Sequence, residues 1–127
     1  MVVVRRLKGT LLIVGLAGCV LAQPASAQTY PTQQINVVVA FAAGGIADAI
    51  GRLVGQKLNE RLKQQVVIEN RGGAGGNLAA RAVSTAAPDG YTLLATTTAL
   101  AVNETATKNR GYNTSDLRPV AIVAISP

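Results

Sequence analysis

The stretch INVVVAFAAGGIAD, residues 35–48, constrains this chain most. A run of β-branched and apolar residues ends at Gly44 and Gly45, and an amphipathic segment begins directly after them. The pattern predicts a buried strand over residues 35–40, a glycine turn and a helix. Such a turn leaves the first N–H groups of the helix without partners and places the positive end of the helix dipole at the strand end. An anion can bind there without any basic side chain, so we expect a carboxylate site at this turn.

The rest of the chain repeats the alternation of strand and helix. A second strand is predicted over residues 66–68, a glycine-rich turn over 72–76, a helix over 77–86, a third strand over 91–95 and a fourth over 119–125. The first helix is expected to bury one apolar stripe, made of Ile46, Ile50, Leu53, Val54, Leu58 and Leu62. This alternation predicts the α/β fold class, with a mainly parallel sheet, right-handed crossovers and flanking helices.

The position of the first strand decides where a ligand would bind. If it lies between the second and third strands, the crossovers diverge between the first and the third, and open α/β sheets bind ligands at such a point. Gly44 and Gly45 would then face a hydroxyl-rich loop made of Thr96, Thr97 and Thr98. Each feature also has a purely structural explanation, since the glycines could only connect two elements and the threonines could only satisfy their own loop.

Two further groups have a structural and a functional interpretation. Asp48 lies in the first turn of the predicted helix, where a carboxylate interacts favourably with the dipole whether or not it touches a ligand. Glu69, Asn70 and Arg71 end the second strand and could contact a ligand, although a network of bonds at the strand end is the commoner arrangement.

The N-terminus predicts export. Arg5, Arg6 and Lys8 precede an apolar run, and Ala-Ser-Ala at 25–27 is a typical cleavage site, so residues 1–27 are interpreted as a signal peptide and the location as the periplasm. Leu-Ala-Gly-Cys, ending at Cys19, gives a lipid-anchored alternative because it resembles the lipobox of bacterial lipoproteins. Cleavage after residue 27 would remove the single cysteine of the chain, and with it disulfide chemistry.

Composition argues against several function classes. The net charge of +6 falls to +3 without the three basic residues of the leader, and the chain has one Phe, three Tyr and no Trp, so a nucleic-acid partner is not expected. No histidine is present, and no nucleophile elbow or cluster of metal ligands is visible. We therefore expect no enzyme activity, no cofactor and no metal.

The second glycine turn keeps a nucleotide-binding alternative open. Its Gly73-x-Gly75 is followed by Leu78 where a dinucleotide fingerprint has its third glycine, and no Gly-Lys-Ser/Thr occurs. Close packing of the following helix on the sheet explains these glycines better. An inert, exported remnant of a binding protein is the third hypothesis.

Four segments also resemble a known family. The order of VVVAFAAGGIAD, VVIENRGGAGGNLAA, AAPDGYTLL and DLRPVAIVA is similar to the N-terminal portion of the tripartite tricarboxylate transporter substrate-binding proteins, the Bug family of periplasmic solute receptors. The resemblance covers the chain after about Tyr30. It implies a type II periplasmic binding protein, which has two α/β lobes around a cleft. It also implies a monomer that captures a small carboxylate (a dicarboxylate, a tricarboxylate, or an amino or aromatic acid) for membrane transporter subunits.

The resemblance further implies which residues hold the ligand. The loop after the first strand would do so largely through main-chain groups and bridging waters, and the threonine loop would add polar contacts; the matching residues are Phe41, Ala43, Gly44, Gly45, Asp48, Thr96, Thr97 and Thr98. Three positions depart from the family pattern: Ala42 and Glu104 stand where prolines are common, and Ile46 replaces a small polar residue.

Length is the largest departure from the family. Such receptors are more than twice as long, so residues 28–127 are expected to form an incomplete first lobe that stops before the second. Capture by domain closure needs two lobes, and we therefore expect weak or no ligand binding by this chain alone.

Overall fold

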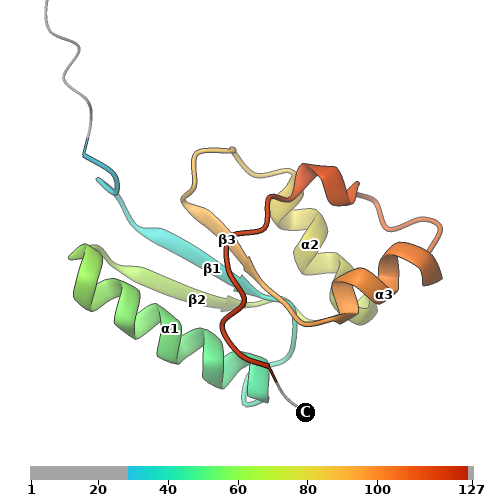
Figure 1. The fold of residues 1–127 in the computed structure, drawn as a ribbon, viewed down its shortest axis with the longest axis horizontal. Coiled ribbons are helices and arrows are strands. Elements are labelled where there is room, and N and C mark those ends of the chain that lie inside the picture. The colour runs from blue at the N-terminus through green and yellow to red at the C-terminus, as the bar shows by residue number, and fades with distance from the viewer. Residues whose placement is uncertain (1–28, 126–127) are drawn as a thin grey trace, which may run out of the picture.

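A computed structural model describes residues 29–125, so the predicted signal peptide and Cys19 lie outside the described residues. The elements are shown in Figure 1. They are β1 (Ile35–Val39), α1 (Ile46–Leu62), β2 (Val66–Asn70), the 3-10 turn η1 (Ala74–Gly76), α2 (Asn77–Ser84), β3 (Thr92–Ala95), α3 (Ala99–Ala106) and the 3-10 turn η2 (Thr114–Asp116). The predicted α/β fold class is confirmed.

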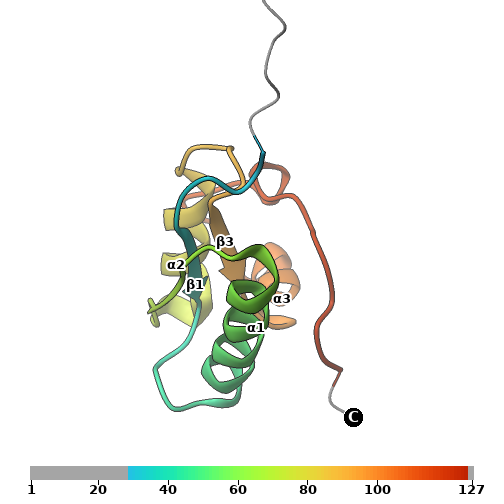
Figure 2. The same cartoon turned by 90° about the vertical axis from the view of Figure 1, so that its left-hand side faces the viewer.

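The three strands form one parallel sheet in the order β2-β1-β3. Val39, the last residue of β1, lies opposite Asn70 of β2 and Ala95 of β3. Helix α1 packs on β1 and β2, α2 packs on β1 and β3, and the two helices cover opposite faces of the sheet (Figures 1 and 2). The first strand is therefore the central one, which meets the condition under which the crossovers diverge beside it.

The core is built around β1. Ile35, residues 37–39 and Ala40 are buried, which fits a strand covered by helices on both faces. On the α2 side, Ala79 completes a cluster with Val38 and Ala40. The small side chains of this cluster let α2 lie close to the sheet, so the position of the α2 N-terminus is fixed by packing.

Helix α1 packs on the sheet through glycines, which the predicted apolar stripe did not include. A Cβ atom on Gly51 would lie 3.0 Å from Cγ2 of Val39, and one on Gly55 would lie 2.8 Å from Cδ1 of Ile68. Ile46 and Leu53 were predicted to be part of the buried stripe, but they are 82% and 59% exposed. The prediction was wrong for these two because the close approach at the glycines turns the buried face of the helix away from them.

The predicted fourth strand is not formed among the described residues. Residues 119–125 pair with no strand in this part of the chain, and Figure 2 shows them running apart from the sheet. The side chains of Val120 and Ile122 are 84% and 83% exposed. β-Branched sequence favours an extended backbone, but a strand also needs a neighbour to pair with, and this segment has none in residues 29–125.

Helix α3 was not predicted. The expectation was a threonine loop followed by a polar stretch from Asn103 onward, whereas residues 99–106 form two helical turns. Not one of the eight residues of α3 is buried, so the helix lacks the apolar stripe that reveals a helix in a sequence. Its position is set by contacts with α2 and η1. Among the helices of residues 29–125, none combines the length and apolar character that crossing a membrane requires.

The packing of β1 gives a stability prediction. Val39→Ala should lower the free energy of unfolding by about 2–3 kcal/mol, because Val39 is fully buried and the truncation removes two methyl groups and leaves a cavity. Val120→Ser is the matched control and should change the free energy of unfolding by less than about 0.5 kcal/mol, since its side chain is exposed. Urea unfolding followed by circular dichroism measures both, and equal losses would contradict the assigned core.

Candidate functional site

The predicted ligand turn leaves the sheet between two neighbouring strand ends. The N–H of Ala40 donates a hydrogen bond to the carbonyl of Ala95 at 2.9 Å, and the N–H of Arg71 donates to the carbonyl of Val39, also at 2.9 Å. β1 is therefore held on both sides as far as its end, and residues 41–45 emerge at the carboxyl edge of the sheet. Thr96 leaves β3 at the same edge, so the structure brings the two predicted loops to adjacent positions, as the sequence predicted.

The start of α1 leaves main-chain donors open. Gly45 is the N-cap residue, and no side chain makes a capping hydrogen bond there. The N–H groups of Ile46, Ala47 and Asp48, the first three residues of the helix, have no acceptor within the helix itself. Gly44 and Gly45 are exposed, and a Cβ built on Gly44 would meet nothing within 4 Å. The turn is thus a solvent-exposed corner of the chain, and the N–H groups at the start of α1 follow it directly.

Gly44 is required for the shape of this turn. Its φ of +86° lies in the left-handed region, which residues with a Cβ adopt only with strain. Its own N–H is already used, because it donates to Oδ2 of Asp48 at 2.9 Å. The Gly44 N–H is therefore not available to a ligand.

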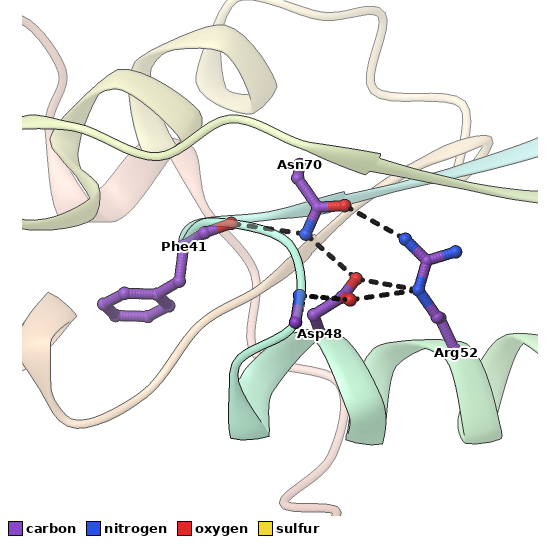
Figure 3. Close-up of polar contacts among 5 residues, drawn as sticks. Phe41, Asp48, Arg52 and Asn70 are labelled. Carbon is purple, nitrogen blue, oxygen red and sulfur yellow. Dashed lines mark hydrogen bonds and ion pairs between the residues drawn. The ribbon is translucent and has the colours of Figure 1, made fainter.

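Asp48 lies at the centre of a polar cluster under the turn (Figure 3). Besides the Gly44 N–H, its carboxylate accepts hydrogen bonds from Nε of Arg52 at 3.0 Å and from Nδ2 of Asn70 at 3.0 Å. The same Asn70 nitrogen lies 3.2 Å from the carbonyl oxygen of Phe41, to which it also donates, and Nη2 of Arg52 donates to Oδ1 of Asn70 at 3.3 Å. Asp48 is only 4% exposed, so its carboxylate is committed to these partners and faces away from solvent.

These contacts fix the charge state of Asp48. The hydrogen bond from Arg52 is the main cause that lowers the Asp48 pKa from 3.8 to about 2, the bonds from Gly44 and Asn70 add to the effect, and desolvation opposes it. Asp48 is therefore an anion under all ordinary conditions. Its charge is balanced by the Arg52 guanidinium, so the cluster adds no net charge to the turn.

The other predicted residues of the first loop differ in what they can offer a ligand. Ala43 is exposed on the turn. Phe41 is half-buried, and its side chain packs against the cluster of Val38, Ala40 and Ala79. In Figure 3 its ring points away from the Asp48 cluster. The carbonyl group of Phe41 accepts a hydrogen bond from Asn70, so both the side chain and the main chain of Phe41 have fixed partners.

The threonine loop begins α3, a role that the sequence did not reveal. Thr98 is the N-cap residue of α3, and Oγ1 of Thr97 accepts a hydrogen bond from the N–H of Ala99 at 3.3 Å. Thr97 and Thr98 are exposed and Thr96 is half-buried. The Thr97 hydroxyl thus serves its own helix start, and the loop adds the start of a second helix to the edge where α1 begins.

The second glycine turn is explained by packing. A Cβ on Gly76 would lie 3.3 Å from the Cβ of Ala40, and one on Gly72 would lie 3.2 Å from the nitrogen of Ala42. The absence of side chains therefore lets α2 approach β1 and lets this loop lie directly against the ligand turn. Within residues 29–125 no group of three potential metal ligands gathers at this edge or elsewhere.

Asn70 and Arg52 are the members of the site that the sequence did not single out as ligand-turn residues. Asn70 was interpreted as part of a strand-end network, which the structure confirms, but its partners, Phe41 after β1 and Asp48 in α1, were not foreseen. Arg52 follows Asp48 by four residues, the spacing of an ion pair on a helix, and this spacing is the signal that could have identified the pair.

Comparison with known proteins agrees with this arrangement. The model of the tripartite tricarboxylate transporter family receptor matches residues 50–127. A UPF0065 protein of Bordetella bronchiseptica is 43% identical over 126 residues, which are 98% of this chain and 38% of that protein. Protein BugT of Bordetella pertussis is 39% identical over 110 residues, which are 84% of this chain and 34% of that protein. The chain thus spans little more than a third of the length of these relatives.

Solved structures show the same likeness. The periplasmic binding protein BugD matches with a TM-score of 0.60 and 37% identity over 66% of this chain and 28% of its own. The R. palustris protein Rpa4515 with adipate matches with a TM-score of 0.50 and 43% identity over 51% of this chain and 22% of its own. With its parallel sheet, its glycine turn and these matches, the chain belongs to the tripartite tricarboxylate transporter receptor family.

Proposed function

We propose that this chain forms part of a periplasmic receptor that binds a small carboxylate at the turn of Gly44 and Gly45. The observation that carries the proposal is the uncapped, exposed start of α1 at the carboxyl edge of the sheet. Open N–H groups and the helix dipole together favour a negative ligand at this place. Family membership and the solved structure with adipate, a dicarboxylate, support this ligand class.

Main-chain recognition fits the charges around the turn. Arg52 is bound to Asp48, and Arg71 donates to Glu69 at 2.6 Å, so both cations have anionic partners in the chain. A ligand with one carboxylate group would therefore meet uncharged N–H donors from Gly45, Ile46 and Ala47. In the proposed site Asp48 supports the turn from beneath instead of touching the ligand, because it is buried in its own cluster.

The threonine loop is assigned to the opposite side of the bound carboxylate. It lies at the adjacent strand end, and the exposed Thr98 at the start of α3 offers a hydroxyl. The binding of a ligand without chemical change, followed by delivery to membrane transporter subunits, is the role that the family description favours. We therefore assign a receptor role in the periplasm and no enzymatic role.

A single substitution can remove one proposed donor and leave the helix intact. Ile46 is the first residue of α1, where proline is well tolerated, and Gly45 before it is extended at φ −85° and ψ 173°, as a residue before proline prefers. Ile46→Pro deletes the N–H of this position and should weaken adipate binding roughly 10- to 100-fold, the value of one hydrogen bond to a charged group. Amide chemical shifts of the 127-residue chain, followed by NMR during titration with adipate, measure the effect.

The matched control is Ile46→Ala, which removes the exposed side chain but keeps the N–H, and it should bind adipate as the unaltered chain does. Adipate should shift the amides of Gly45 and Ala47 in a saturable way, in the millimolar range expected of one lobe, while the uncharged diamide of adipate should not. Saturable shifts caused by adenosine monophosphate at residues 72–76 would instead support the nucleotide hypothesis. Of the two outcomes expected from the length of the chain, weak binding or none, the proposed function commits to weak binding, so absence of saturable adipate shifts in the unaltered chain would contradict it.

A further inference from the structure

The ligand turn is held by a loop from a different part of the chain. Asn70, the last residue of β2, donates one amide nitrogen to both the Phe41 carbonyl and the Asp48 carboxylate. Asp48 in turn accepts from the N–H of Gly44. The two ends of the turn, at Phe41 and at Gly44, are therefore connected through one asparagine side chain that lies outside the turn itself (Figure 3).

The backbone of the same loop provides a second constraint. Gly72 lies so close to the turn that a Cβ at this position would come within 3.2 Å of the Ala42 nitrogen and 3.4 Å of the Phe41 carbonyl carbon. The loop after β2 thus holds the turn by a hydrogen-bonding side chain and by direct backbone packing. Both constraints act on the segment between the end of β1 and Gly44.

The orientation of the Phe41 carbonyl has an electrostatic consequence. A carbonyl oxygen carries partial negative charge, and one that faced the open corner would repel a carboxylate bound there. The bond that Asn70 donates holds the Phe41 oxygen toward β2, and the bond that the Gly44 N–H donates to Asp48 holds this N–H beneath the turn. The Phe41 oxygen and the Gly44 N–H are then both occupied while the start of α1 stays uncapped, so the turn is arranged for an anion before any ligand arrives.

We propose that Asn70, supported by Gly72, is a positioning residue of the carboxylate site: it sets the orientation of the main-chain donors without touching the ligand. This inference rests on the proposed function and adds a specific determinant to it. Arg52 completes the arrangement, because its guanidinium bonds both Asp48 and the Asn70 oxygen and so holds the asparagine with its nitrogen toward the turn.

The first test concerns Asp48, which accepts hydrogen bonds from Gly44, Arg52 and Asn70. The Asp48 pKa lies near 2 in the folded chain and near 3.8 in a chain without these contacts, so ionisation of Asp48 favours the folded state. Its contribution to the free energy of unfolding should be complete above about pH 4 and should be lost progressively as the pH falls toward 2. Asp48→Asn should remove this part of the pH dependence, and urea unfolding of both chains between pH 2 and pH 6 measures the difference. Identical pH profiles would show that Asp48 is not held in this way.

The decisive test uses Asn70→Ala and Gly72→Ala in the 127-residue chain, with adipate as the probe and NMR amide shifts as the readout. Both variants should keep the amide shifts of α2 and β3, should move those of Gly44 and Gly45 in the absence of adipate, and should bind adipate with affinity lower by on the order of tenfold. Asn70→Ala should also speed hydrogen exchange at the Gly44 N–H, because the partner of that N–H is no longer held in place. The matched control is Asn59→Ala, the same type of change at an exposed position of α1 outside the Asp48 cluster, and it should leave adipate affinity unchanged.

The outcomes separate this inference from the proposed function. If the unaltered chain shows no saturable adipate shift, the proposed function fails, and the altered Gly44 shifts and exchange rate still decide whether Asn70 holds the turn. If the unaltered chain binds adipate and both variants bind it equally well, Asn70 and Gly72 do not position the donors and the inference is wrong. Should one variant unfold, the other still gives the answer, because the two act on the turn through different contacts.

Discussion

The parallel pairing of β1 with strands on both sides is the constraint on which the rest of the structure depends. It buries β1 on both faces and at both edges, which explains why residues 37–40 are almost fully excluded from solvent. It also forces the crossovers through α1 and α2 onto opposite faces (Figure 2). The turn that follows β1 has no further strand to pair with and is left at the carboxyl edge, where α1 and α3 both begin.

At this edge the chain leaves main-chain donors open where a stabilising cap could have been placed. A serine, threonine or aspartate at the N-cap position would satisfy one of the free N–H groups and typically add about 1 kcal/mol to helix stability. Gly45 provides no such cap, and Asp48 reaches back only to Gly44. Stability given up at a helix start is common at binding sites, because the same donors that a cap would occupy are needed for a ligand.

The proposed recognition by the main chain has a consequence for how such a site can vary. Side chains on the turn could change without loss of the main-chain donors, provided that the backbone keeps its orientation. Control of that orientation then falls to residues away from the ligand. Asn70 and Gly72, which come from the loop after β2, are in the position to exert it.

The sequence alone was sufficient for the elements whose signals are local. β1 and its glycine turn were predicted because a continuous apolar run ends at two glycines. β2, α2 and β3 were predicted in the same way, because Gly, Pro and Asp residues typical of turns mark where these elements begin and end. Helix α3 and the unpaired state of residues 119–125 were not predicted. The first lacks a buried stripe, and the second depends on whether a neighbouring strand is present, which no local pattern records.

In the candidate site, too, some features follow from the sequence and others only from the tertiary structure. The sequence determined that a glycine corner at the start of a helix would offer main-chain donors, because backbone geometry at Gly44 and the absence of a cap at Gly45 follow from residue type. Only the tertiary structure decided that Asp48 is buried beneath the corner and that Asn70 links Phe41 to it, because the Asn70 side chain reaches the turn across the β1–β2 pairing. Contacts between residues that are 22 or 29 positions apart arise from strand register, and register is fixed by the packing of the whole sheet.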